Sequence, residues 1–190
     1  MFNNDNVVFF DGEFTVLSTT GAITFLSMAF IKPSGEELYL ELDVPNSEIE
    51  DSWFIENVVP HLTGNKVTKN KAAGLIKEFI GETETKPTLI ADVNQFDWMG
   101  ICGVFGVWDT PIQFGVWDVP FHYIPIDFAS ILFARGIDPD VNREEFAAKL
   151  GVNIGDFKKH NALSDARVLK EMWYKLDKYN NGLLRKLSGS

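Results

Sequence analysis

Val7-Val8-Phe9-Phe10-Asp11-Gly12-Glu13-Phe14 is the segment near the start of the chain from which the fold can be predicted. Its first four residues are apolar on both alternating faces, as expected for a central strand that is covered on both sides of a sheet. Asp11 and Glu13 then continue the face that begins with Val7 and Phe9. We therefore predict a buried strand that carries two carboxylates toward its end.

Two further apolar runs follow this segment and predict a three-stranded antiparallel meander. They cover residues 21–31 and 37–42, and Pro33-Ser34-Gly35 supplies the turn between them. Residues 88–91 and 121–126 are predicted to form two parallel strands, separated by helical segments. The expected fold class is therefore α/β, with a mixed five-stranded sheet flanked by helices.

Six segments space their apolar residues as helices do. They cover residues 52–62, 69–80, 95–105, 128–134, 143–150 and 162–179. At 190 residues, the chain is long enough for one full-sized domain and short for two. We predict a single domain over residues 1–179 and a flexible C-terminal tail over residues 180–190.

The composition is that of a globular protein, with 45% apolar and 23% charged residues. Residues 1–6 carry no basic stretch before an apolar run, and no apolar run approaches the roughly 20 residues of a membrane span. We therefore expect neither a secretory signal nor a membrane partner. Cys102 is the one cysteine, so an internal disulfide and a thiolate metal cluster are excluded, which fits a reducing cytosol. The expected location is cytoplasmic.

Carboxylates on apolar faces are the strongest chemical signal in the sequence. On a helix over residues 162–179, Asp165 lies on the stripe that also holds Leu169 and Met172. Asp165, like Asp11 and Glu13, is thus predicted to be a carboxylate on a buried face. Such a group is costly unless it is paired, hydrogen-bonded or bound to a metal. A divalent cation would neutralise all three, and ligation by oxygen alone favours Mg²⁺ or Mn²⁺ over zinc.

Two other residues are candidates for the same site. Asp97 begins the helix after the strand 88–91, and functional groups gather at such strand ends. Taken alone, Asp97 is as readily a helix-start carboxylate favoured by the macrodipole, and Asp92 is a lower-ranked competitor. His160 precedes the helix that carries Asp165. A lone histidine is more often structural, but beside a metal-bound water it can act as a general base.

Three motifs in this order resemble those of the DEDDh branch of the DEDD 3′-to-5′ exonucleases, which share the ribonuclease H-like fold. The motifs are Phe10-Asp11-Gly12-Glu13-Phe14-Thr15, Asn94-Gln95-Phe96-Asp97 and His160-Asn161-Ala162-Leu163-Ser164-Asp165-Ala166. The resemblance covers nearly the whole chain, and the third motif is the most specific. Within the group, Phe14 and the segment Trp53-Phe54-Ile55-Glu56-Asn57-Val58-Val59-Pro60 are most similar to the small stand-alone bacterial and phage exoribonucleases. Proofreading members usually carry Thr where this chain has Phe14.

The resemblance implies hydrolysis of a phosphodiester with two Mg²⁺ or Mn²⁺ ions per active site. Asp11, Glu13 and Asp165 would hold one ion, Asp11 with Asp97 would organise the other, and His160 would deprotonate the attacking water. Bound ions would also reconcile a net charge of −10 with a nucleic-acid partner, because they place positive charge where the phosphate must lie.

Three further residues are expected to contact the substrate. Phe14 would stack or wedge against the terminal nucleotide, with an apolar core role as an equal alternative. Asn161 and Arg167 are the weaker candidates and would contact phosphate.

The expected activity is that of a 3′-to-5′ exoribonuclease that releases nucleoside monophosphates from single-stranded or 3′-overhang nucleic acid, with RNA favoured. A DNA exonuclease with the same site is the nearest alternative, since nothing in the sequence identifies a contact to a 2′-hydroxyl. A nucleic-acid-binding module without turnover is the second. A homodimer also stays open, because relatives often dimerise.

One sequence feature stands outside these motifs. Phe105-Gly106-Val107-Trp108-Asp109 recurs as Phe114-Gly115-Val116-Trp117-Asp118. We interpret it as a Trp-rich loop packed on the core rather than as a loop that stacks on bases.

Overall fold

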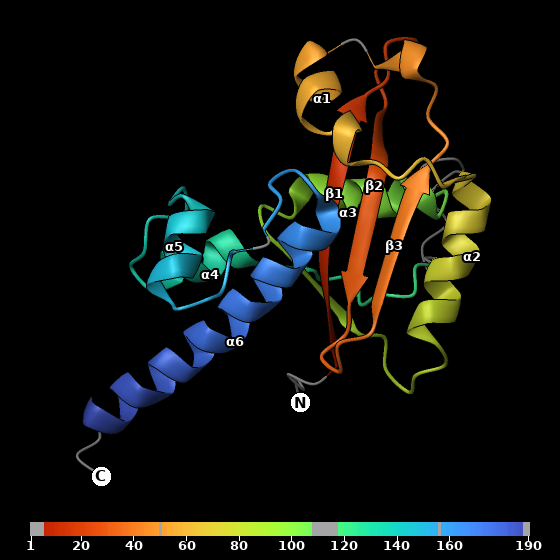
Figure 1. Cartoon of the computed structure of the whole chain (residues 1–190). Helices are drawn as coiled ribbons and strands as arrows, with labels where there is room; N and C mark the ends of the chain where they lie inside the picture. Colours follow the sequence, from red (N-terminus) through yellow and green to blue (C-terminus); the bar gives the residue numbers. More distant parts are fainter. Residues whose placement is uncertain (1–5, 50, 108–117, 156, 188–190) are drawn as a thin grey trace.

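A mixed β-sheet with helices on both faces forms the centre of the molecule (Figure 1). The computed structural model describes residues 6–49, 51–107, 118–155 and 157–187, with side chains described as far as Leu176. Among these residues, no helix has the length and apolarity needed to cross a membrane. Most of the Phe-Gly-Val-Trp-Asp repeat, from Trp108 to Trp117, lies outside the described residues, so its interpretation stays a prediction.

The sheet has six strands in the order β4-β3-β2-β1-β5-β6. Their bounds are Val7–Val16 (β1), Ile23–Ile31 (β2), Glu37–Leu42 (β3), Lys66–Val67 (β4), Thr88–Ala91 (β5) and Ile126–Asp127 (β6). The first three form the predicted antiparallel meander, and β5 and β6 add the predicted parallel pair beside β1.

The predicted number of five strands was wrong by one. The additional strand, β4, has two residues and pairs in parallel with β3, and two residues are too few to show an alternating pattern. The last strand is Ile126–Asp127 rather than residues 121–126.

The helices follow the predicted segments to within one residue, apart from two larger changes. Their bounds are Ser52–Asn57 (α1), Lys69–Ile80 (α2), Gln95–Val104 (α3), Phe128–Ala134 (α4), Arg143–Lys149 (α5) and Ala162–Leu187 (α6). The segment 52–62 is divided into α1 and a 3₁₀ turn at Val59–His61, in which Pro60 has no N–H to donate. The last helix continues to Leu187, beyond the predicted end at residue 179.

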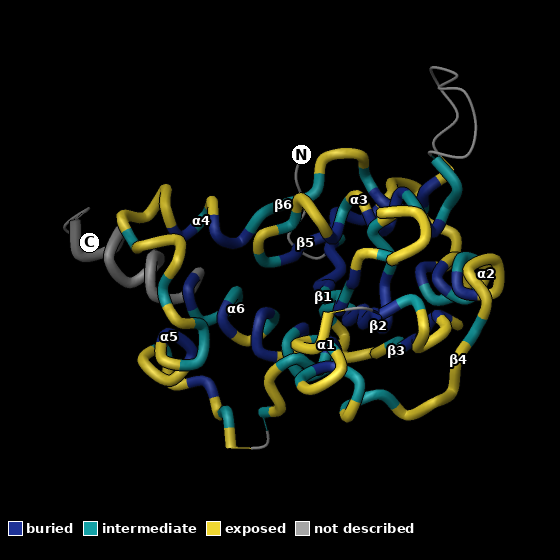
Figure 2. Tube along the Cα trace, turned by 90° about the horizontal axis from the view of Figure 1, so that it is seen from above, coloured by how far each residue is buried: buried dark blue, intermediate teal, exposed yellow. Residues whose placement is uncertain are grey.

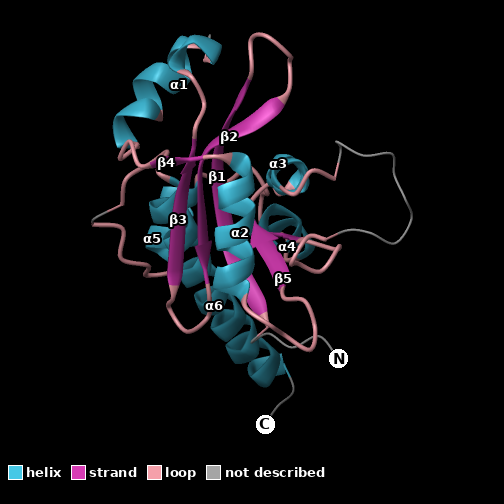
Figure 3. Ribbon diagram, turned by 90° about the vertical axis from the view of Figure 1, so that its right-hand side faces the viewer, coloured by secondary structure: helices cyan, strands magenta, loops and turns pink. Residues whose placement is uncertain are grey.

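Alternate residues of β1 enter two separate cores. Val8 and Phe10 pack with residues of α2 and α3, whereas Val7 and Phe9 pack with residues of α4, α5 and α6. Figure 3 shows α2 on one side of the sheet and α5 and α6 on the other. In Figure 2, seen from above, the buried strands lie between these helices. Because side chains alternate along a strand, the face of Val7 and Phe9 leads to Asp11 and Glu13.

Candidate active site

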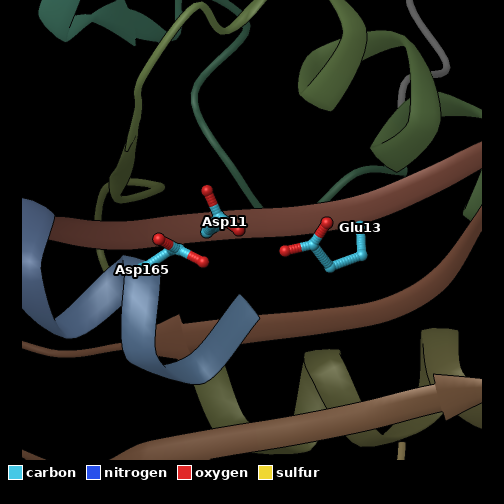
Figure 4. Close-up of side chains that lie close together, drawn as sticks. All are labelled: Asp11, Glu13 and Asp165. Atoms are coloured by element: carbon cyan, nitrogen blue, oxygen red, sulfur yellow. The ribbon is translucent and has the colours of Figure 1, made fainter. Parts of the chain in front are cut away.

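Three carboxylates, two from β1 and one from the distant helix α6, meet where β1 passes the start of α6. One carboxylate oxygen from each of Asp11, Glu13 and Asp165 lies within 4.8 Å of the other two. Figure 4 shows the three side chains directed toward one another. The β1–β2 register shifts between Glu13 and Phe14, and such irregularities often occur beside active sites, where they redirect a side chain.

The first turn of α6 fixes the orientation of Asp165. The backbone N–H of Asn161 donates to Oδ2 of Asp165 at 3.1 Å, and the N–H of Ser164 donates to Oδ1 of Asn161 at 3.1 Å. Asn161 therefore caps the helix, a local role that its place in the third motif did not predict. The positive end of the helix dipole also favours a carboxylate at this position.

Asp97 lies outside this set of three, on α3, which packs closely against the sheet. A Cβ atom on Gly12 would lie 2.3 Å from Cε1 of Phe25, and one on Gly100 would lie 2.4 Å from Cζ of the same ring. Only glycine at both positions lets β1 and α3 press against Phe25. Asp97, one helical turn before Gly100, is buried with 6% of its surface exposed.

Burial raises the pKa of each of the four carboxyl groups, and neighbouring negative charges raise it further for Asp11, Asp97 and Asp165. Burial raises the pKa of Glu13 to about 7. Burial and then the charge of Glu13 raise the pKa of Asp165 to about 7. For Asp11, burial and the charges of Asp165, Asp97, Glu13 and Asp92 raise the pKa well above its usual range, and for Asp97 burial and the charges of Asp92 and Glu13 do the same. The charge of Asp97 therefore affects the pKa of Asp11, and the charge of Glu13 affects that of Asp97. This holds although Asp97 is not one of the three residues whose carboxylate oxygens lie within 4.8 Å of one another.

This donor set fits a hard divalent cation. It consists of carboxylate oxygens without sulfur or imidazole nitrogen, which suits Mg²⁺ or Mn²⁺ better than zinc. A bound cation would also favour the ionised carboxylates that burial and repulsion disfavour. The chemistry of the residues present thus agrees with the predicted metal.

A cavity of about 440 Å³ opens over the carboxylates. Its lining includes Asp11, Glu13, Asp165, His160 and two basic residues, Arg143 and Lys159. The Lys159 ammonium forms an ion pair with Glu144, with 3.4 Å between Nζ and Oε1. It is therefore directed to a partner outside the cluster of four acids.

His160 lies on the wall of this cavity in an unusual backbone conformation. Its φ of 59° is in the left-handed region, which non-glycine residues adopt infrequently and often at functional sites. Burial, Lys159 and His61 lower the pKa of His160, against an opposing effect of Glu144. The imidazole ring contacts the Trp53 ring edge to face, with the ring centroids 4.7 Å apart. A neutral imidazole of this kind can accept a proton at neutral pH.

Not all of the residues that were predicted to contact the substrate line the cavity. The Arg167 guanidinium is bound by the carboxylate of Glu37, with 2.7 Å between Nε and Oε1, and Arg167 does not line the cavity. Phe14 stacks on Phe96 with the ring centroids 5.4 Å apart, and it also packs against the core. Both roles proposed for Phe14, in the core and toward a nucleotide, thus stay open.

Two residues at this site were not singled out in the sequence. Arg143 lines the cavity, and Trp53 contacts His160. In the sequence, Trp53 belonged to the segment 53–60 that resembles the small exoribonucleases, but no role was predicted for it. Arg143 had no distinguishing signal, because a basic residue at the start of a helix is ordinarily solvated.

No protein-family model and no curated protein matches the sequence. Solved structures do match the fold. One is S. pombe Pop2p in a form with bound Mg²⁺ and Mn²⁺, with a TM-score of 0.65 and 10% identity over 90% of this chain and 82% of that chain. Another is the nuclease domain of 3′hExo, a DEDDh family member bound to rAMP, with a TM-score of 0.64 and 10% identity over 92% of each chain.

The chain has the ribonuclease H-like fold of DEDDh nuclease domains. A third structure, of a 3′-exonuclease in 3′-end-specific recognition of a histone mRNA stem-loop, agrees with a TM-score of 0.63 and 11% identity over 92% of this chain and 82% of that chain. The predicted fold class and the resemblance to DEDDh exonucleases are thereby confirmed at the level of the fold. The similarity to the bacterial and phage subgroup stays a prediction.

Proposed function

We propose that this protein is a metal-dependent 3′-to-5′ exoribonuclease that releases nucleoside monophosphates. The observation that carries the proposal is the convergence of three carboxylate oxygens within 4.8 Å, with Asp97 buried nearby and His160 on the wall of the same cavity. In a DEDDh-type fold, these are the residue types that phosphodiester hydrolysis requires.

Each residue of the cluster has a proposed part in the reaction. Asp11, Glu13 and Asp165 would hold one Mg²⁺ or Mn²⁺ ion, and Asp11 with Asp97 would organise a second. Bound ions supply positive charge that stabilises both the attacking and the leaving oxygen. His160 accepts the proton of the attacking water at its ring nitrogen. The Trp53 ring, which contacts the imidazole, limits the orientations that His160 can adopt.

RNA is the preferred substrate class in this proposal. Of the structures with the same fold, one is bound to rAMP and another concerns recognition of a histone mRNA stem-loop, which supports binding of ribonucleotides here. A DNA exonuclease with the same site is the competing function. Single-stranded or 3′-overhang ends are the proposed form of the substrate, since one strand must enter a cavity of about 440 Å³.

A cleavage assay with end-labelled oligonucleotides tests the proposal. The 5′-labelled substrates are single-stranded RNA, DNA of the same sequence and a duplex with a 3′ overhang, each with Mg²⁺, Mn²⁺ or a chelator. We expect a ladder that shortens from the 3′ end of RNA and that disappears with chelator and with Asp11→Asn. Glu37→Gln is the matched control, because it removes a carboxylate that lies outside the cavity, and it should retain activity.

The assay also separates the alternatives. Faster shortening of DNA would replace RNA by DNA as the substrate. Cleavage in the interior of the strand, or full activity in Asp11→Asn, would refute the exonuclease proposal. Binding of RNA without any cleavage would favour the non-catalytic module. Cytoplasmic location and a homodimer remain proposals, to be tested by fractionation of cells and by analytical ultracentrifugation.

A further inference from the structure

A fifth carboxylate, Asp92, faces the cavity but is bound by an arginine. The Arg143 guanidinium donates from Nε to Oδ2 of Asp92 at 2.5 Å and from Nη2 to Oδ1 at 2.9 Å. About one-fifth of each side chain is exposed, 22% for Arg143 and 21% for Asp92. A two-point contact of this kind between guanidinium and carboxylate fixes the geometry of both groups.

The same guanidinium is anchored to the backbone of the loop before α5. Nη1 of Arg143 donates to the carbonyl oxygen of Val141 at 2.6 Å, and Nη2 donates to that of Pro139 at 2.8 Å. Pro139 and Val141 themselves line the cavity. Arg143 thus links Asp92, which follows the last residue of β5, to the backbone of this loop.

The backbone beside Asp92 is also constrained. Val93 has a φ of 54°, a left-handed conformation that is a clear outlier for a β-branched residue. Such strain persists only where the surroundings hold it. The N–H of Asn94 donates to Oδ1 of Asp127 at 3.3 Å on one side, and Arg143 holds Asp92 on the other.

Asp92 is near enough to the cluster of four acids to act on them. Asp92 and Asp11 line the same cavity over the carboxylates and a second, smaller cavity beside it. The negative charge of Asp92 contributes to the raised pKa of Asp11 and of Asp97. Without Arg143, Asp92 would be another carboxylate available to a cation.

We propose that Arg143 is a positioning residue for the metal site, which holds Asp92 away from the ions and thereby limits the ligands to Asp11, Glu13, Asp97 and Asp165. This inference rests on the proposed function. The guanidinium acts in two ways, because it occupies both oxygens of Asp92 and places a positive charge near the cation site.

Binding of Mn²⁺ to the full chain without substrate, followed by calorimetry and by electron paramagnetic resonance, tests this role. Arg143→Gln should bind Mn²⁺ roughly tenfold more tightly or bind one additional ion, since Asp92 becomes available. The double variant Arg143→Gln/Asp92→Asn should return to the wild-type stoichiometry. That reversal distinguishes release of Asp92 from a general structural effect.

Two single variants complete the experiment. Arg143→Lys keeps the positive charge but loses the two-point contact, so its Mn²⁺ affinity should rise by less than that of Arg143→Gln. It also provides a test if Arg143→Gln does not fold. Arg167→Gln is the matched control, because it removes an arginine–carboxylate pair, with Glu37, that lies outside the cavity, and it should leave Mn²⁺ binding unchanged.

Several results would overturn the inference. Unchanged or weaker Mn²⁺ binding in both Arg143 variants would show that Arg143 does not restrict the ligands. An increased KM for RNA with unchanged Mn²⁺ binding would show instead that Arg143 contacts phosphate. If the wild-type protein itself binds no Mn²⁺, the proposed function fails together with this inference, whereas wild-type binding without an effect of Arg143→Gln refutes the inference alone.

Discussion

Replacing Glu13 by glutamine should stabilise the metal-free protein at neutral pH, although it removes a proposed metal ligand. Burial raises the pKa of Glu13 from 4.5 to about 7 in the folded protein. The folded state therefore retains this proton at pH values where the unfolded chain has lost it. Stability from this group is complete below about pH 4.5 and is lost as the pH rises toward 7.

The size of the effect follows from this difference in pKa. Ionisation of Glu13 at pH 7 reduces the free energy of unfolding by about 3 kcal/mol, an order-of-magnitude value. Asp165 acts in the same direction, because its pKa is also raised to about 7. Wild-type protein in chelator should therefore be clearly less stable at pH 7 than at pH 5, and Glu13→Gln should reduce that difference.

Urea denaturation of both proteins at the two pH values, with chelator and with Mn²⁺, measures these changes. In Mn²⁺ the order should reverse, with wild type gaining more stability than the variant. Glu41→Gln is the matched control. Glu41 is also buried, more deeply than Glu13, but accepts hydrogen bonds from the N–H groups of Thr63 and Gly64 and from the Tyr39 hydroxyl. Its replacement should destabilise the protein by about 1–3 kcal/mol at both pH values.

One result would refute this reasoning. If wild type in chelator is as stable at pH 7 as at pH 5, and Glu13→Gln is no more stable than wild type, burial does not disfavour the ionised form of Glu13. A cation would then not be needed to stabilise this carboxylate.

Three other substitutions have defined outcomes. His160→Gln should lower kcat by roughly 10²–10⁴-fold and leave Mn²⁺ binding intact in calorimetry, because the imidazole is proposed to accept a proton without binding metal; unchanged kcat would exclude it as the base. Gly100→Ala should destabilise the protein by about 1–3 kcal/mol in thermal denaturation, since the new Cβ would clash with Phe25. Gly74→Ala, in α2 with no atom within 4 Å of the new Cβ, should instead stabilise by about 0.5–1 kcal/mol, and equal effects at the two glycines would contradict the packing argument. Val93→Asn should raise the unfolding free energy by about 1 kcal/mol, because asparagine tolerates a positive φ; a lower midpoint of urea denaturation would show that Val93 is not strained.

The periodic parts of the fold could be predicted from the sequence. The alternation along Val7 to Glu13 placed both acids on one face, and the structure has that face against α6. The apolar stripe of the last helix placed Asp165 toward the sheet. The bounds of α2 are those predicted, Lys69–Ile80, because its apolar spacing and the Thr68 cap agree.

Contacts between distant residues could not be predicted in this way. Arg143 and Asp92 are 51 residues apart, and neither has a local pattern that indicates the other. The contact of Trp53 with His160 depends on how α1 lies over the end of β1. The position of Arg167 was predictable in part, since two residues along a helix turn a side chain by about 200° from Asp165. It therefore faces Glu37 rather than the cavity.

Anomalous scattering from a crystal soaked in Mn²⁺ is the most direct test of the central claim that the four acids form a metal site. We expect two peaks roughly 3.5–4 Å apart, in contact with carboxylate oxygens of Asp11, Glu13, Asp97 and Asp165. The Asp11→Asn protein, soaked in the same way, should lose at least one of them. Peaks elsewhere on the surface, or none between these four side chains at saturating Mn²⁺, would contradict the account.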